Sequence, residues 1–73
     1  MPTIDHNLLR AAREAAGLTR EQAGTALARS YPAIQAYERG VIVPPGNVLI
    51  AMARLYGVAV EDLCRDDKPA GVR

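Results

Sequence analysis

The chain has 73 residues, of which 23% are charged, and its formal net charge is +1. This length fits a single domain with a thin core, which a dimer partner would help to stabilise. No apolar run approaches the roughly 18 residues of a membrane span, and the N-terminus lacks the order of a signal peptide, so a cytoplasmic protein without membrane contact is expected. Cys64 is the only cysteine, which excludes an intramolecular disulfide and a cysteine-based zinc site.

A first helix is predicted over residues 6–16, where Leu9 and Ala12 recur at helical spacing. Asp5 is a suitable N-cap, because its side chain can accept a hydrogen bond from a free amide of the first turn. Gly17 follows, where a helix C-terminus favours a left-handed residue.

A second helix is predicted to begin at Thr19. Thr19 and Gln22 match the capping box, in which each side chain bonds the backbone amide of the other residue. Gly24 lies inside this helix, where glycine costs about 1 kcal/mol relative to alanine. We therefore expect another part of the backbone to approach closely at this position.

A third helix is predicted to start about three residues after the second and to end at Gly40. Ser30 is a good N-cap, and Pro32 is tolerated in a first turn because its missing N–H has no helical partner there. Pro32 also disfavours helical angles at Tyr31, which places the expected helix start at Pro32. So short a link forces the two helices close to perpendicular, which is a helix-turn-helix arrangement.

Two further helices are predicted, over residues 47–56 and residues 60–65, and no strand is expected. Five short helices with tight connections predict an all-α, compact orthogonal bundle. The domain is expected to span residues 1–66. Residues 67–73 are charged and carry proline and glycine, so they are expected to form a flexible C-terminal tail.

Several short motifs occur along the chain in an ordered spacing. Their residues are Gly17, Leu18 and Thr19, then Tyr37, Glu38, Arg39 and Gly40, and finally Tyr56, Gly57 and Val58. With these motifs the chain resembles the Cro/CI-type helix-turn-helix family, also called the XRE family, over residues 9–63. The resemblance implies a five-helix, lambda-repressor-like bundle whose third helix enters the major groove of double-stranded DNA while the second crosses the phosphate backbone.

The resemblance also implies an ion pair between Arg13 and Glu38, which would orient the third helix more than it stabilises the fold. The alternative is that both residues are solvated surface charges. The chain departs from the family at Ala28, which replaces the usual glycine of the turn and must adopt strained angles or a slightly altered turn. Ala59 replaces the usual serine before the fifth helix, so that helix lacks a side-chain cap.

The resemblance places Tyr31, Pro32 and Ala36 at base-contacting positions. Gln35 is the one amide near this face, and it could reach an adenine edge or a phosphate. This set contains no arginine to form the usual bidentate bond with guanine, so specificity is expected to be modest and to rely on DNA shape, thymine methyl contacts and water. The alternatives are that this face reads no bases and that Tyr31 packs against the second helix.

Four residues are assigned to phosphate contacts. Ser30 and the free amides at the start of the third helix can hold a phosphate. Arg20 matches a phosphate-contacting position of the family, and Arg29 and Arg39 flank the third helix. The alternative for each arginine is a solvated surface charge. Three such arginines per subunit predict a moderate salt dependence of binding.

The loop after the third helix departs most from the family, because its usual basic residues are replaced by Val41, Ile42 and Val43. One interpretation folds this loop onto the core. The other makes it a self-complementary homodimer interface, which would present two third helices about 34 Å apart to an inverted repeat.

The leading functional hypothesis is a small repressor, encoded by a phage or mobile element or acting as an antitoxin, that binds double-stranded DNA. The alternative is a protein-interaction module that binds another regulator or the transcription machinery with little affinity for DNA. An enzyme is not expected, because the single histidine, His6, and the single cysteine form no recognisable catalytic group. No metal, cofactor or small-molecule ligand is expected.

Overall fold

The helices begin where side chains satisfy free backbone amides. Asp5 accepts a hydrogen bond from the Asn7 amide at 2.9 Å. The Thr19 hydroxyl accepts one from the Gln22 amide at 3.1 Å, and the Gln22 side chain accepts one from the Thr19 amide at 2.9 Å, which confirms the predicted capping box.

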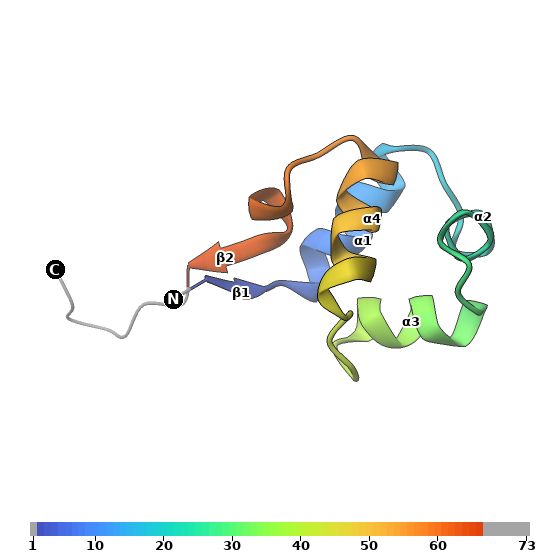
Figure 1. Cartoon of the computed structure of the whole chain (residues 1–73), viewed down its shortest axis with the longest axis horizontal. Coiled ribbons are helices and arrows are strands. Elements are labelled where there is room, and N and C mark those ends of the chain that lie inside the picture. Colours follow the sequence, from blue (N-terminus) through green and yellow to red (C-terminus); the bar gives the residue numbers. More distant parts are fainter. Residues whose placement is uncertain (1, 67–73) are drawn as a thin grey trace, which may run out of the picture.

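The computed structural model describes residues 2–66, so the predicted tail of residues 67–73 lies outside it. Its helices are α1 (His6–Ala15), α2 (Arg20–Leu27), α3 (Tyr31–Arg39) and α4 (Gly46–Tyr56) (Figure 1).

The prediction of a fifth helix is wrong, because that segment forms only η1 (Val60–Leu63), a single 3-10 turn. Ala59 offers no side-chain acceptor to the first amides of a longer helix. Asp62 instead reaches back and accepts a hydrogen bond from the Ala59 amide at 3.0 Å, which closes the short turn. Residues 2–66 therefore contain four α-helices and one 3-10 turn, and none of these is long and apolar enough to cross a membrane.

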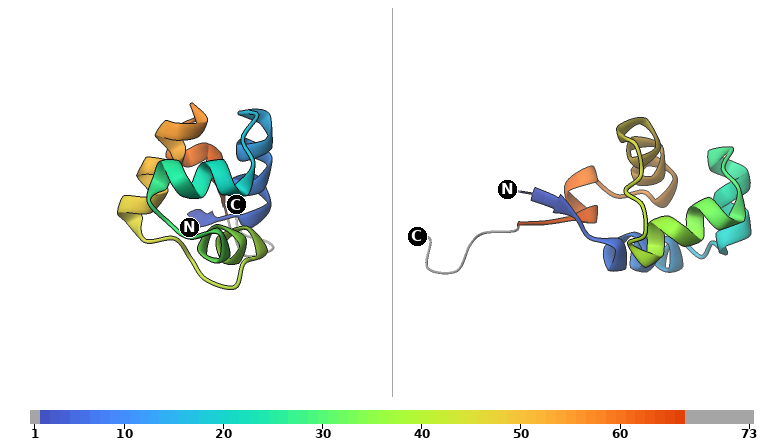
Figure 2. Two further views of the ribbon diagram at one scale, coloured as in Figure 1. Left: turned by 90° about the vertical axis from the view of Figure 1, so that its right-hand side faces the viewer. Right: turned by 90° about the horizontal axis from the view of Figure 1, so that it is seen from below.

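The expectation that strands are absent is also wrong. β1 (Pro2–Ile4) and β2 (Cys64–Asp66) pair antiparallel, with Thr3 opposite Arg65. Figure 1 and Figure 2 show this ribbon at the end of the molecule that lies away from α2. Three residues are too few to display the alternating pattern that predicts a strand. The all-α prediction is therefore corrected to a mostly helical fold with a small two-stranded sheet.

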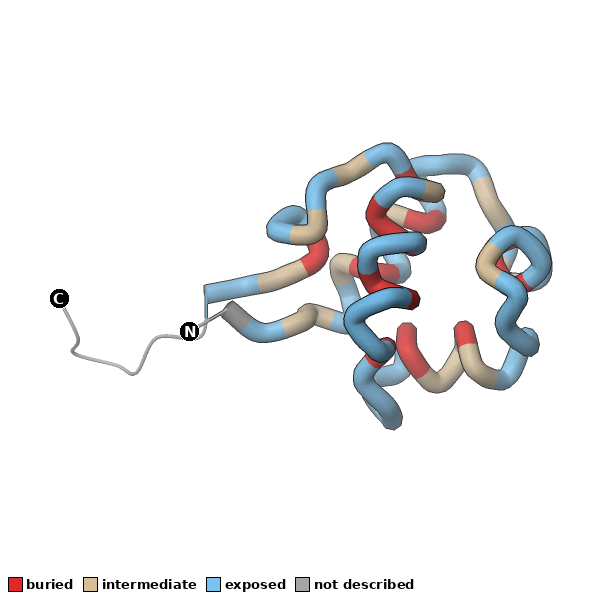
Figure 3. Tube along the Cα trace, viewed as in Figure 1, coloured by how far each residue is buried: buried red, intermediate tan, exposed pale blue. Residues whose placement is uncertain are grey.

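Apolar side chains from the four helices and η1 meet in one core. Leu9 of α1, Ile34 of α3, Met52 of α4 and Leu63 of η1 are fully buried. Figure 3 shows that buried positions recur on α1, α3 and α4 while much of the remaining trace is exposed. Full burial of one such side chain stabilises the fold by about 1.5–3 kcal/mol. The other core residues are Ala23, Tyr37, Val48, Leu49, Ala53 and Tyr56.

Two small residues shape the turn between α2 and α3. A Cβ atom at Gly24 would lie only 2.8 Å from the Arg29 carbonyl oxygen, which confirms the expected close approach of another backbone segment. Ala28 ends α2 with φ 54° and ψ 41°, so of the two outcomes expected for it the structure shows the strained one. The left-handed conformation costs a non-glycine residue about 1–2 kcal/mol. The chain thus keeps the tight turn of a helix-turn-helix without a glycine at this position.

Candidate nucleic-acid interface

The start of α3 exposes part of the surface that the resemblance assigns to base contacts. The helix begins at Tyr31, one residue earlier than predicted, with Pro32 in its first turn. Both residues are exposed, whereas Gln35 and Ala36 are half-buried. The most accessible groups on this side of α3 are therefore a phenol and a proline ring, and the Gln35 amide is less available than expected.

A buried carboxylate holds α3 against the two preceding helices. Arg13 of α1 donates to Glu38 of α3 twice, from Nε to Oε2 at 2.6 Å and from Nη2 to Oε1 at 3.1 Å. The third arm of the Arg13 guanidinium, Nη1, donates to the Leu18 carbonyl oxygen at 2.7 Å. The side chain of Glu38 is 0% exposed and that of Arg13 is 9% exposed. The structure thus brings these two residues together as a buried pair with planar, bidentate geometry.

Arg20 joins the same carboxylate, which the sequence analysis missed. Its Nε donates to Glu38 Oε1 at 3.1 Å, and its side chain is 25% exposed. Hydrogen bonding to Glu38 first, and to the Tyr31 hydroxyl second, raises the pKa of Arg20 above its ordinary value. Arg20 and Glu38 are far apart in the sequence and lie on different helices, so no local pattern could have signalled their contact.

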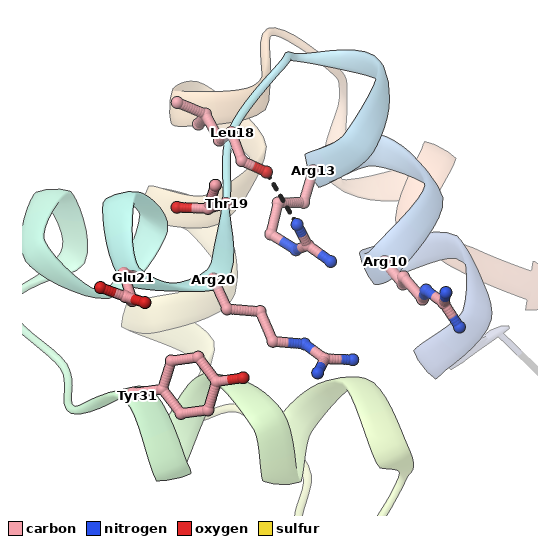
Figure 4. Close-up of a pocket in the computed structure, with 7 residues that line it drawn as sticks. All are labelled: Arg10, Arg13, Leu18, Thr19, Arg20, Glu21 and Tyr31. Carbon is pink, nitrogen blue, oxygen red and sulfur yellow. Dashed lines mark hydrogen bonds between the residues drawn. The ribbon is translucent and has the colours of Figure 1, made fainter.

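Arg20 lies in an open recess of about 360 Å³ between α1, the start of α2 and α3. Figure 4 shows the Tyr31 ring between Arg20 and the α3 backbone, with its hydroxyl pointing toward the Arg20 guanidinium. Arg10 lines the same recess and pairs with Glu14 at 3.3 Å on the exposed side of α1. The recess therefore gathers three arginines, of which Arg13 and Arg20 are paired with Glu38.

The remaining phosphate candidates lie close to the two ends of α3. Arg29 and Arg39 are exposed, so their guanidinium groups are accessible to a polyanion. The Ser30 hydroxyl caps α3 by accepting a hydrogen bond from the Ala33 amide at 3.3 Å. Pro32 has no N–H, so this helix start offers fewer free amide donors to an anion than most helices do.

The loop that follows α3 is exposed. Val41, Ile42 and Val43 have exposed fractions of 69%, 48% and 71%. The Val41 amide donates to the Ala36 carbonyl oxygen at 3.0 Å, which ties the start of the loop to the end of α3. The next residue, Pro44, is buried. The structure therefore contradicts the interpretation in which this loop folds onto the core.

Tyr56, at the end of α4, lies within the electrostatic influence of Glu38 and Arg13. Its side chain is buried, and its hydroxyl has no hydrogen-bond partner among the described residues. Burial, followed by the negative charge of Glu38, raises the pKa of Tyr56 to about 12, while Arg13 opposes this rise. Tyr56 is therefore a neutral phenol near the two charged residues that join α1 to α3.

Comparison with known proteins shows that the chain is similar both to a protein family and to solved structures. A family model described as a helix-turn-helix domain matches residues 7–65. No curated protein is similar enough to match. A solved structure that matches is the P22 c2 repressor protein in complex with a synthetic operator in the presence of Tl+. The two chains are 23% identical with a TM-score of 0.76, and the match covers 84% of this chain and 92% of that chain, which shows a shared fold.

The family match extends from α1 to the second residue of β2 and includes Arg13, Arg20 and Glu38, which form the buried ion pairs. The tight turn between α2 and α3, and the buried Glu38 that faces inward from α3, are consistent with a helix-turn-helix domain. The chain therefore belongs to the helix-turn-helix domain family, and its sequence resembles the Cro/CI type.

Proposed function

We propose that this protein is a transcriptional regulator that binds double-stranded DNA in a sequence-specific manner, with α3 in the major groove and α2 across the phosphate backbone. Its role in this proposal is that of a small repressor of the phage, mobile-element or antitoxin type. The P22 c2 repressor, which shares the fold, is in complex with an operator, and this supports the same docking mode here.

The observation that carries the proposal is the contrast between the two sides of α3. The inner side is held by the buried Glu38 carboxylate, which fixes the direction of the helix relative to α1 and α2. The outer side begins with exposed Tyr31 and is flanked by exposed Arg29 and Arg39. A rigid helix with an accessible face between two cations suits a groove that is lined by phosphates.

Within this proposal the contacts divide into two groups. Tyr31 and Pro32 contact base edges, with Gln35 and Ala36 at the margin of the interface because they are half-buried. The phosphate contacts come from Arg29, Ser30 and Arg39, together with the part of the Arg20 guanidinium that its pairing with Glu38 leaves accessible.

Selection of the purified protein against a random duplex pool at moderate salt tests the proposal. Enrichment of a defined site is the expected result, and the affinity should fall with salt by a slope of about −0.9 for each phosphate contact. Arg29→Ala should weaken binding and make the slope less steep by about 0.9, the contribution of one phosphate contact. Arg54→Ala is the matched control, because it removes an exposed arginine from α4, a helix to which no DNA contact is assigned. A pool without enrichment would contradict the proposal.

The second candidate function is a protein-interaction module that binds another regulator or the transcription machinery. The exposed loop of Val41, Ile42 and Val43 favours it, because clustered apolar side chains are better suited to a protein surface than to phosphates. Weak binding to heparin at low salt, together with a stable complex with a protein partner, would support this function over the first.

The same loop is a candidate homodimer interface for the DNA-binding function. A two-fold contact would cover these side chains and pair two copies of α3 for an inverted repeat. Val41→Asp should then shift the sedimentation profile toward the monomer and reduce binding to the full repeat. A profile that does not change would contradict this assignment of the loop.

A further inference from the structure

The outer face of α3 is apolar over its first two turns. Pro32, Ala36 and Arg39 recur at the i, i+4 and i+7 spacing that places side chains on one face of a helix. The opposite face carries the buried side chains of Ile34 and Tyr37. Figure 1 shows α3 on the outside of the helical body, with the other three α-helices to one side of it. A proline ring and an alanine methyl group therefore precede the first charge on this outward face.

The backbone at the start of α3 adds few hydrogen-bond donors to this face. Pro32 has no N–H, and the Ala33 amide already donates to the Ser30 hydroxyl at 3.3 Å and to the Ser30 carbonyl oxygen at 3.1 Å. The Ile34 amide donates to the same carbonyl oxygen at 3.2 Å. Hydrogen bonding from this part of α3 to a base edge is therefore restricted, and nonpolar contact predominates.

Nonpolar contact has a specific partner in the major groove. The C5 methyl group of thymine is the one nonpolar group that the base pairs present there, whereas cytosine presents an N4 amino donor and no methyl group. Exposed Arg29 and Arg39 lie close to the two ends of α3, where they can meet phosphates that border the groove. This combination of flanking charge and central apolar surface suits a groove whose floor carries a methyl group.

We propose that Pro32 recognises the C5 methyl group of a thymine, so that binding responds to cytosine methylation, an inference that rests on the proposed DNA-binding function. The contact is to the methyl group and not to the O4 or N4 atom of the base. At this base pair 5-methylcytosine therefore replaces thymine, whereas cytosine and uracil do not. Ala36, half-buried one turn further along α3, borders the same contact. A duplex methylated at this cytosine is bound more tightly than its unmethylated counterpart.

The test starts from the duplex that selection enriches and replaces each thymine in turn by deoxyuridine, which lacks only the methyl group. At one thymine the replacement should weaken binding about 3- to 5-fold, the ratio expected for one methyl group removed from water. At the same base pair, 5-methylcytosine opposite guanine should bind as tightly as thymine opposite adenine. Cytosine opposite guanine should bind as weakly as deoxyuridine.

Pro32→Ser separates a direct contact from an effect of the methyl group on DNA shape. The variant lacks the apolar ring at an exposed position, so it should bind thymine and deoxyuridine equally at the sensitive base pair. Pro45→Ser is the matched control, because it makes the same change at an exposed proline before α4, a helix to which no DNA contact is assigned. This control should keep the full preference for thymine. Thermal unfolding of both variants monitors the fold.

Three results would overturn the proposal. The first is an enriched site in which no thymine is sensitive to deoxyuridine, and the second is equal affinity for cytosine and 5-methylcytosine at the sensitive base pair. The third is a Pro32→Ser variant that keeps the whole preference for thymine. Each leaves the proposed function intact, since the unaltered protein still binds its site. If the unaltered protein enriches no duplex, the proposed function and this inference fail together.

Discussion

Replacing Glu38 with alanine is expected to remove a large part of the stability of this fold. The side chain is 0% exposed and accepts hydrogen bonds from two arginines, of which Arg13 is itself 9% exposed. Removing one partner of a buried ion pair costs about 3–5 kcal/mol, because the other charge stays buried without compensation. A domain of 73 residues has a total stability of about 4–11 kcal/mol. The variant should therefore be marginally folded.

Thermal unfolding followed by circular dichroism measures this effect. In a domain of this size 1 kcal/mol shifts the Tm by about 4–8 °C, so Glu38→Ala should lower the Tm by at least about 12 °C. Arg13→Ala should lower the Tm less, because Arg20 still pairs with Glu38 at 3.1 Å. Arg20→Ala should lower the Tm least of the three variants, because the Arg20 side chain is 25% exposed and its pairing is screened by solvent.

A double-mutant cycle and a control variant separate the energy of the Arg13–Glu38 pairing from other losses of stability. The double variant of Arg13→Ala and Glu38→Ala should cost less than the sum of the two single variants, by about 0.5–3 kcal/mol. Arg39→Ala, which removes an exposed charge from the position next to Glu38, should change the Tm little. Strict additivity, or equal losses in Glu38→Ala and Arg39→Ala, would refute the reasoning.

Three other changes test the backbone and the buried phenol. Ala28→Gly should raise the stability by about 1 kcal/mol, because glycine adopts the left-handed angles freely; a lower Tm would contradict the strain. Gly24→Ala should lower the Tm, because its Cβ would meet a backbone oxygen at 2.8 Å, whereas Gly46→Ala, with nothing within 4 Å, is the harmless control. Stability should fall by about 2–3 kcal/mol between pH 10 and pH 12, where Tyr56 ionises in the unfolded chain but stays protonated in the fold; an identical fall in Tyr56→Phe would contradict this.

Local patterns in the sequence predicted most of the helical framework. The capping box of Thr19 and Gln22 and the close approach at Gly24 are both present in the structure. Such features depend on groups within a few residues of one another, so their chemistry can be read from spacing alone. The start of α3 was misplaced by one residue, because the restriction that Pro32 imposes on Tyr31 is only a preference.

Contacts between distant residues were beyond this kind of prediction. The resemblance implied the pair of Arg13 and Glu38, but Arg20 was assigned to phosphates and in the structure also pairs with Glu38. The same limit applies to the two strands, whose pairing joins Thr3 to Arg65. Neither contact leaves a periodic signal, since each depends on how separate elements pack.

The sequence by itself determined the helical framework and the helix-turn-helix family, because caps, turn residues and spaced motifs act over short distances. The tertiary structure decided three further points, namely which arginines share the buried carboxylate, that the Val41 loop is exposed, and that the last predicted helix is a 3-10 turn joined to a small sheet. These depend on burial and on long-range pairing, whose energies exist only once the chain has packed.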